Sequence, residues 1–267
     1  MKIPSHHAAP LTLLYRDDHY VVIHKPAGLL VHRSRISQDR EFVLQRLRDQ
    51  VGAHVFPVHR LDRATAGALA FGFSAEAARR LALEFEQRRV AKRYLAVARG
   101  WTEADGVIDH PVADEDGNGI ALPAKTRYKT VSRVELPVRV DRYPSARYSL
   151  LCVEPISGRR QQIRKHFKHI SHPLIGDTTH GNGRHNRFFR AHFEVSRLLL
   201  LAYALRFCHP YQGNAVSLYT PIDKEWHQML ELFGLAQADI ESLCATAVAV
   251  TKTPSDKPGD GQGVLAQ

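Results

Sequence analysis

The chain has 267 residues, 44% hydrophobic and 24% charged, which is the composition of a globular protein that can bury a full core. Its formal charge of +10 favours a polyanionic partner, either nucleic acid or an anionic membrane surface. No apolar run is long enough to cross a membrane, and the three widely spaced cysteines argue against a disulfide framework or a thiolate metal site.

The N-terminal part of the chain predicts a strand pair that leads into a tight loop. Residues 1–10 read as a flexible leader without the apolar core of a secretory signal, so we expect a cytoplasmic protein. Two apolar runs, 11–15 and 20–23, flank a polar turn. The stretch 24–28 (His-Lys-Pro-Ala-Gly) then bends the chain, because proline and glycine interrupt a strand.

Two capped helices are predicted on either side of a buried strand. The first covers 39–51, with Asp39 as its N-cap, and the second covers 75–88, with Ser74 as its N-cap. Between them, the apolar run 68–73 indicates a strand that is buried on both faces.

The rest of the chain alternates strands with few helices. The region 101–146 is rich in Asp, Gly and Pro, with short strand-like pieces such as 127–134, which indicates surface hairpins and loops that face the substrate. We expect one globular domain over 11–236 and a disordered tail over 251–267. The other elements follow from apolar alternation and capping residues: strands over 91–100, 146–154, 198–207 and 215–219, and helices between Gly158 and Pro173, over 223–233 and over 237–250.

The segment 57–67 (Pro-Val-His-Arg-Leu-Asp-Arg-Ala-Thr-Ala-Gly) contains the most informative charge pattern. Asp62 lies between Arg60 and Arg63, and nearby cations favour the ionised form of a carboxylate. An ionised carboxylate can act as a nucleophile or a base rather than as a proton donor. The alternative is a surface loop whose charges pair without any further role.

Two other side chains have informative surroundings. Tyr94 shares a strand face with Ala96 and Ala98, whose small side chains leave room for a flat partner; an ordinary strand tyrosine is the alternative. Arg164 lies beside the buried stripe of its predicted helix and can reach inward. The alternative there is an exposed arginine that only covers apolar surface with its stem.

Three stretches together resemble the signature motifs of the RluA family of pseudouridine synthases. The segment 59–67 resembles the motif around the catalytic aspartate of that family, and 92–94 (Lys-Arg-Tyr) resembles its second motif. The stretch 158–166 (Gly-Arg-Arg-Gln-Gln-Ile-Arg-Lys-His) resembles its third. The chain departs from the usual patterns at His24, Ala66, Arg160, Gln161 and His180, where the family commonly has Asn, Ser, Thr or Lys, His, and Tyr.

The resemblance implies a mixed α/β (α+β) fold: a large, mainly antiparallel, bent β-sheet with flanking helices and a central basic cleft. It also implies that Asp62 is the catalytic carboxylate, that Tyr94 packs against the target base, and that Arg164 pairs with Asp62. Further side chains would bind the substrate or shape its site: Arg60, which would fill the space left by a flipped base, and Arg63, Thr65, Arg159, Ile163 and Lys165.

The implied reaction is the isomerisation of uridine to pseudouridine, which needs no cofactor and no metal. The branch of the family that the chain resembles most acts on uridine 65, in the T-stem of tRNA, so tRNA is the expected partner, with no membrane and no obligate protein partner. A ribosomal RNA uridine is the alternative target. Because too few residues precede Leu11 for the N-terminal S4 domain of many relatives, the catalytic domain itself is expected to select the RNA.

Two readings from other functional classes compete with this one. His166, His169 and His172 are spaced three apart, as in some metal sites, but on one helix they sweep about 120° of arc and do not converge on one ion. A non-catalytic RNA-binding protein would explain the positive charge, yet the chain lacks the signatures of the small RNA-binding modules.

Overall fold

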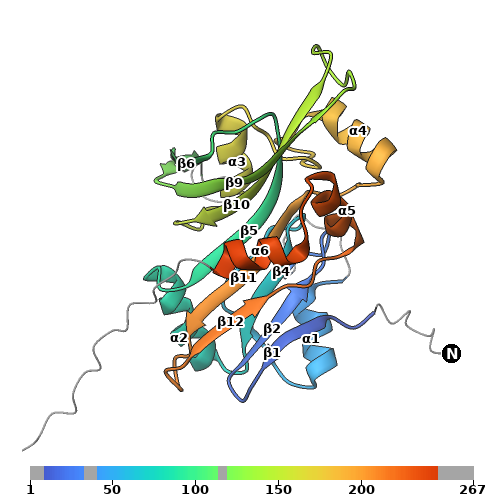
Figure 1. The fold of residues 1–267 in the computed structure, drawn as a ribbon. Coiled ribbons are helices and arrows are strands. Elements are labelled where there is room, and N and C mark those ends of the chain that lie inside the picture. Colours follow the sequence, from blue (N-terminus) through green and yellow to red (C-terminus); the bar gives the residue numbers. More distant parts are fainter. Residues whose placement is uncertain (1–8, 33–40, 114–118, 246–267) are drawn as a thin grey trace, which may run out of the picture.

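The computed structural model describes residues 9–32, 41–113 and 119–245, and its centre is one large β-sheet (Figure 1). The predicted cap Asp39, residues 246–250 of the last predicted helix and the predicted tail lie outside these ranges. The sheet has ten strands, and a separate two-stranded sheet pairs β7 (Val112–Ala113) with β8 (Ala121–Leu122). The strands of the large sheet are β1 (Thr12–Arg16), β2 (Tyr20–Lys25), β3 (Phe56–Pro57), β4 (Ala66–Gly72), β5 (Ala91–Arg99), β6 (Asp105–Asp109), β9 (Lys125–Leu136), β10 (Ala146–Pro155), β11 (Leu200–Cys208) and β12 (Ala215–Tyr219).

The order of the strands places the predicted motifs beside one another. The main path runs β1-β2-β4-β11-β5-β10-β9-β6, with β12 paired to β11 and β3 paired to β4. Only β4 and β11 are parallel among the paired strands described, so the sheet is mainly antiparallel, as predicted. Strand β11 pairs with the start of β4 on one side and, at Ala202, with Tyr94 of β5 on the other. The loop that holds Asp62 therefore opens beside Tyr94.

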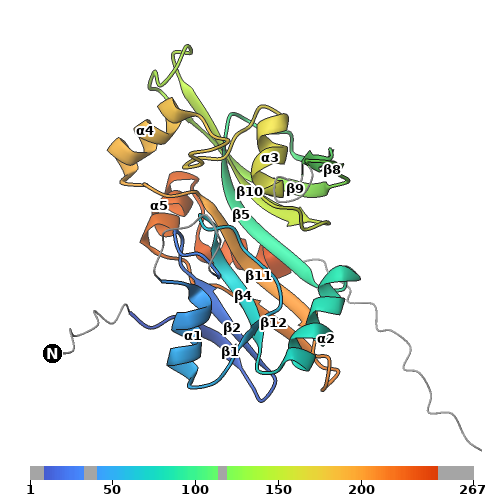
Figure 2. The ribbon, with the colours of Figure 1, turned by 180° about the vertical axis from the view of Figure 1, so that it is seen from behind.

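Helices cover both faces of this sheet, and four apolar clusters fill the contacts. The helices are α1 (Val43–Val51), α2 (Ala75–Glu86), α3 (Gln162–His169), α4 (Gly183–Phe193), α5 (Lys224–Leu232) and α6 (Gln237–Ala245). Helix α3 packs on Ala96 and Ala98 of β5, whereas α4, α5 and α6 pack on Leu95 and Val97. Because alternate residues of a strand point to opposite faces, α3 and the α4–α6 group lie on opposite sides of the sheet (Figure 2).

The capping residues explain where several helices begin and end. The Ser74 side chain accepts a hydrogen bond from the Ala77 N–H, which confirms the predicted start of α2. Helix α1 begins at Val43, after an N-cap at Phe42 that provides no side-chain bond, so its predicted start at Asp39 is wrong. Helix α2 ends at Glu86, two residues before its predicted end, and Arg88 has a positive φ of 59°.

Two further expectations from the sequence need correction. The region 101–146 contains all of β9, a twelve-residue strand that is longer than the expected strand piece 127–134 and pairs with β10 from Thr126 to Leu136. The region is therefore an integral part of the sheet rather than mainly surface loops. Helix α4, whose Phe189 is completely buried, has no counterpart in the sequence prediction. Among the described residues, no helix is both long and apolar enough to cross a lipid bilayer.

Gly67 permits the close approach of β4 to β11. Its φ is +121°, and a Cβ atom at this position would lie 2.3 Å from the Ala202 carbonyl oxygen and 2.6 Å from the Ala202 nitrogen. Both neighbours are backbone atoms inside the sheet and cannot move away cheaply. We therefore expect Gly67→Ala to lower the free energy of unfolding by about 2–3 kcal/mol. Urea denaturation measures this loss, and Gly119→Ala is a contrasting control, since Gly119 also has a positive φ but its Cβ would meet no atom within 4 Å.

Candidate active site

Asp62 lies at the wall of a cavity of about 500 Å³ in the centre of the sheet. The cavity is lined by the loop before β4, the first half of β5, the end of α2 and the segment that leads into α3. Of the residues predicted to form the site, Asp62, Tyr94, Arg60, Thr65, Arg159 and Ile163 all line it. Its other charged lining residues are Glu86, Arg88, Lys92 and Arg160, so cations outnumber anions on the cavity wall.

Burial raises the pKa of the Asp62 carboxyl above the ordinary value of an aspartate. The guanidinium groups of Arg164, Arg60 and Arg160, and a hydrogen bond from the backbone N–H of Gln161, oppose this rise without cancelling it. The neighbouring cations by themselves would lower the pKa of Asp62, whereas the structure gives a raised pKa. The direction of the shift that the charge pattern predicts is therefore wrong. A carboxylate with a raised pKa is the stronger base once it is ionised.

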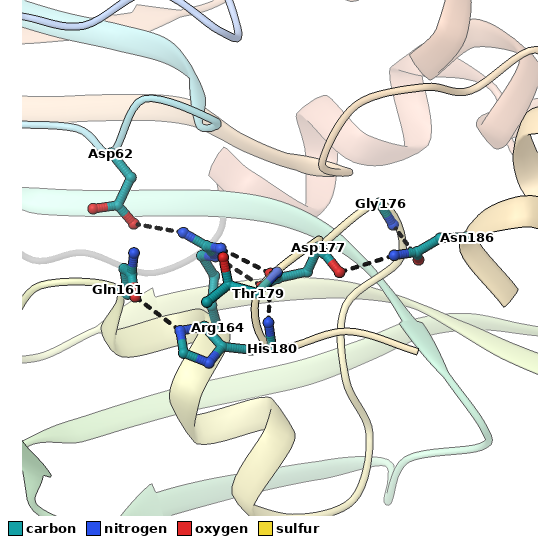
Figure 3. Close-up of polar contacts among 8 residues, drawn as sticks. All are labelled: Asp62, Gln161, Arg164, Gly176, Asp177, Thr179, His180 and Asn186. Atoms are coloured by element: carbon teal, nitrogen blue, oxygen red, sulfur yellow. Dashed lines mark hydrogen bonds and ion pairs between the residues drawn. The ribbon is translucent and has the colours of Figure 1, made fainter. Parts of the chain in front are cut away.

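Arg164 is oriented by Asp177 more than by Asp62. Its Nε and Nη2 atoms each donate a 2.7 Å hydrogen bond to the Asp177 carboxylate, and the side chains are 6% and 0% exposed (Figure 3). The closest approach of Arg164 to Asp62 is 3.8 Å, from Nη1 to Oδ2, which is an ion pair without a short hydrogen bond. The guanidinium group is therefore held in a fixed plane by one carboxylate and faces the other.

Asp177 also organises the loop that follows α3. Its Oδ1 atom accepts hydrogen bonds from the N–H groups of Thr179 (2.9 Å) and His180 (2.8 Å). Asn186 of α4 braces the same loop: its side chain donates to the Asp177 carbonyl oxygen and accepts from the Gly176 N–H, both at 2.8 Å (Figure 3). Burial alone would raise the pKa of Asp177, but the hydrogen bonds from Arg164 and His180 lower it below its usual value.

Two departures from the usual family motifs meet in space. His180 Nε2 and Gln161 Oε1 lie 2.8 Å apart, so the imidazole donates to the amide oxygen (Figure 3). Gln161 has a left-handed backbone (φ 55°), and its own N–H donates to the Asp62 carboxylate. The chain of contacts from Asp62 through Arg164, Asp177, His180 and Gln161 thus returns to Asp62.

Lys25, the last residue of β2, holds the Asp62 loop through a hydrogen bond to its backbone. Its ammonium group is completely buried and donates to the carbonyl oxygens of Pro26 (2.8 Å), Leu29 (2.7 Å) and Arg63 (3.1 Å). All three donors are used, which compensates for the loss of hydration. Burial lowers the pKa of Lys25 to about 7, although the charge of Asp62 opposes this shift.

Two of the residues predicted to bind substrate do not line the cavity. Arg63 donates from Nε to the Gly28 carbonyl oxygen at 2.9 Å, and Lys165 donates to the Ala113 carbonyl oxygen at 3.2 Å. Both side chains thus hold backbone segments, which the sequence pattern alone does not show. Conversely, the roles of Asp177 and Lys25 were missed, because their partners become neighbours only in the folded chain.

The histidines of the competing metal-site reading lie in separate environments. Each of the three regularly spaced histidines has a different environment: His166 Nε2 bonds the His110 carbonyl oxygen, His169 stacks on the His110 ring, and His172 Nδ1 bonds the Arg99 carbonyl oxygen. Within the described part of the chain, no group of three or more His, Cys, Asp or Glu side chains could hold a metal ion.

Comparison with known sequences identifies relatives over most of the chain. Residues 19–169 match the family described as RNA pseudouridylate synthase. The chain is 43% identical over 233 residues to a tRNA pseudouridine synthase C of Vibrio vulnificus, a match that covers 84% of this chain and 95% of the relative. It is 44% identical over 234 residues to a protein of the same name from Salmonella typhi, covering 84% and 90%.

Solved structures show the same fold. The human RNA pseudouridylate synthase domain containing 1 superposes with a TM-score of 0.67 and 22% identity, covering 96% of this chain and 100% of that one. The human RNA pseudouridylate synthase domain containing 4 superposes with a TM-score of 0.66 and 21% identity, covering 85% of this chain and 94% of that one. The mainly antiparallel fold and the sequence matches agree with the resemblance carried by the three motifs: the chain belongs to the RNA pseudouridylate synthase family.

Proposed function

We propose that this protein is a tRNA pseudouridine synthase that isomerises uridine 65, in the T-stem of tRNA, with Asp62 as its catalytic carboxylate. The observation that carries the proposal is the placement of the Asp62 carboxylate, 19% exposed, at a cavity whose wall is cationic and contains the Tyr94 ring. The cations suit an RNA backbone, and the ring suits a flat base. The names of the relatives in Vibrio and Salmonella support tRNA as the substrate class.

The chemistry requires a base that has left its helix. Pseudouridine formation breaks the N1–C1′ bond and makes a C5–C1′ bond, so the uracil must detach, turn and reattach without loss from the site. A base inside a stem is first flipped out, at a cost of a few kcal/mol in stacking and pairing. Arg60, which is exposed and lines the cavity, would fill the vacated space, and Tyr94, which also lines it, would stack on the flipped ring.

Each member of the site then has a distinct task. Asp62 acts as nucleophile or base, Arg164 faces it with a positive charge, and Asp177 fixes the plane of that guanidinium group. Burial raises the pKa of the Tyr94 hydroxyl, with the Asp62 charge adding to the effect, so that the ring stays a neutral phenol at working pH. Thr65 shapes the loop, since its N–H donates to the Asp62 carbonyl oxygen at 3.1 Å.

A direct test uses purified protein and unmodified tRNA transcripts. Carbodiimide labelling and primer extension would reveal a new stop at uridine 65, and the same map of RNA from cells without the gene would lose that stop. A tRNA that stays unmodified, together with a lost ribosomal RNA site, would keep the chemistry and replace the substrate. Absence of pseudouridine on every RNA tested would favour a non-catalytic RNA-binding protein.

The raised pKa of Asp62 predicts the acid side of the pH profile. As the pH falls through this pKa, the carboxylate is protonated and loses its basicity, so kcat/KM should fall with a midpoint above the ordinary aspartate value of 3.8. The Arg160 guanidinium lowers the pKa of Asp62, and its removal in Arg160→Gln should therefore move the midpoint to still higher pH. Single-turnover rates between pH 4 and 8 measure both midpoints. An identical midpoint in the two enzymes would show that the fall of activity in acid reports the protonation of a group other than Asp62.

A further inference from the structure

A second cavity, of about 750 Å³, lies at the other end of β5 from Tyr94. It is enclosed by the end of β5, the tip of the β9–β10 hairpin and α4, which lie side by side in both ribbon views (Figures 1 and 2). It shares no lining residue with the cavity at Asp62. Arg99 lines it and stands five residues after Tyr94, about 17 Å along an extended strand.

The charge of this cavity is positive and partly uncompensated. Its only lining carboxylate among the described residues, Asp141, is already paired with Arg184 outside it, and Arg147 is paired with Glu135 at 3.1 Å. The half-buried Arg99 side chain helps to lower the pKa of the Asp141 carboxyl, but it makes no hydrogen bond or ion pair within 4 Å with another described residue. A guanidinium in this position presents its donors to whatever enters the cavity.

Two exposed aromatic rings stand beside these cations. Trp101 is 42% exposed, with the Arg147 guanidinium 4.2 Å from its ring centroid, and Tyr143 is 56% exposed, with Arg142 at 4.7 Å. Exposed rings backed by arginine form the stacking surface that single-stranded nucleic acid uses, because every base has a flat face. His185, also in the lining, is buried, and burial lowers its pKa to about 4, so it adds no charge at neutral pH.

We propose that this cavity binds a second part of the RNA substrate, with Arg99 on a phosphate and with Trp101 or Tyr143 against an unstacked base. The inference rests on the proposed RNA substrate but concerns a different place on the protein. Tyr94 and Arg99 lie about 17 Å apart along β5, which is more than one nucleotide spans, so the two cavities would bind different nucleotides of one RNA.

The test compares two RNAs on one set of variants. Dissociation constants are measured at several salt concentrations for a full tRNA transcript and for a hairpin of the T arm alone, in an Asp62→Asn background that leaves the RNA unmodified. Arg99→Gln should weaken binding of the full tRNA three- to tenfold and lower the salt slope by about one. An equal loss on the hairpin would place the second contact within the T arm, and a loss on the full tRNA alone would place it elsewhere in the tRNA. Arg99→Lys should retain most of the affinity for the full tRNA, and Trp101→Leu should lower this affinity roughly tenfold.

Controls separate this contact from the main site. Arg48→Gln removes the same charge from α1, which lines neither cavity, and should leave both constants unchanged. An unchanged dissociation constant for full tRNA with Arg99→Gln would overturn the second contact, and so would an equal loss with Arg48→Gln. Turnover of tRNA by the enzyme with intact Asp62, assayed in parallel, tests the proposed function separately.

Discussion

Replacement of Asp62 by Asn should lower the rate of pseudouridine formation by roughly a thousandfold or more, while the affinity for tRNA changes little. The amide has nearly the same shape as the carboxylate but is neither a base nor a nucleophile. Binding survives because the cationic lining, including Arg60, Lys92 and Arg160, is untouched. Single-turnover kinetics and filter binding on the same protein preparation measure the two quantities.

The same variant should unfold at the same temperature as the unmodified protein or at a slightly higher one. The folded state holds the Asp62 proton more tightly than the unfolded state, because the pKa of this group is raised. Above that pKa the ionised carboxylate therefore costs folding free energy, and the neutral amide avoids the cost. Asp109→Asn, an exposed carboxylate paired with Lys125, is the matched control and should leave turnover intact. Substantial turnover by Asp62→Asn would show that Asp62 is not the catalytic carboxylate. Loss of folding together with activity would assign Asp62 a structural role instead.

Removal of the Asp177 carboxylate should produce the largest loss of stability, about 3–5 kcal/mol for Asp177→Ala. Arg164 would remain buried with Asp62 as its remaining ion-pair partner among the described residues, at 3.8 Å, and the loop after α3 would lose two hydrogen-bond acceptor contacts. Urea denaturation measures the loss. Asp49→Ala, which breaks an exposed pair with Arg48, should cost less than about 1 kcal/mol.

A double-mutant cycle and a pH series identify the cause of that loss. Arg164→Met combined with Asp177→Ala should cost less than the sum of the two single changes, because neither charge is then left buried alone. The pKa of Asp177 is lowered in the folded state, so its stabilising effect is present above the ordinary aspartate pKa and is lost as the pH falls through the lowered value. The difference in the free energy of unfolding between the Asp177→Ala variant and the wild-type protein should therefore become smaller as the pH falls. Strict additivity and a difference that does not vary with pH would show that the pair does not act as a buried unit.

The Gln161–His180 contact shows how departures from a family motif can compensate each other. Each residue taken alone replaces a side chain that relatives commonly have, and the sequence gives no reason for either change. In the fold, Gln161 stands at the start of α3 and His180 in the loop held by Asp177, and the two side chains bond each other. The pair is explained only when both positions are seen together.

Local sequence patterns determined the elements and the identity of the central residues. Ser74 accepts the capping hydrogen bond expected of it, Asp223 caps α5 at the start of the predicted helix 223–233, and the apolar run before Phe73 forms the wholly buried β4. Such features depend on a few neighbouring residues, so they can be read directly from the chain. The motifs around Asp62, Tyr94 and Arg164 likewise named the family that the comparisons establish.

Tertiary structure decided what these residues experience. The direction of the Asp62 pKa shift depends on how much water the fold removes, and this burial outweighs the adjacent arginines that dominate the sequence pattern. The partner of Arg164 is Asp177, whose position is set by α4 through Asn186. Burial and ion pairing depend on contacts between segments that are far apart in the chain. The sequence alone therefore identified the catalytic candidate, but not the direction of its pKa shift or the main partner of Arg164.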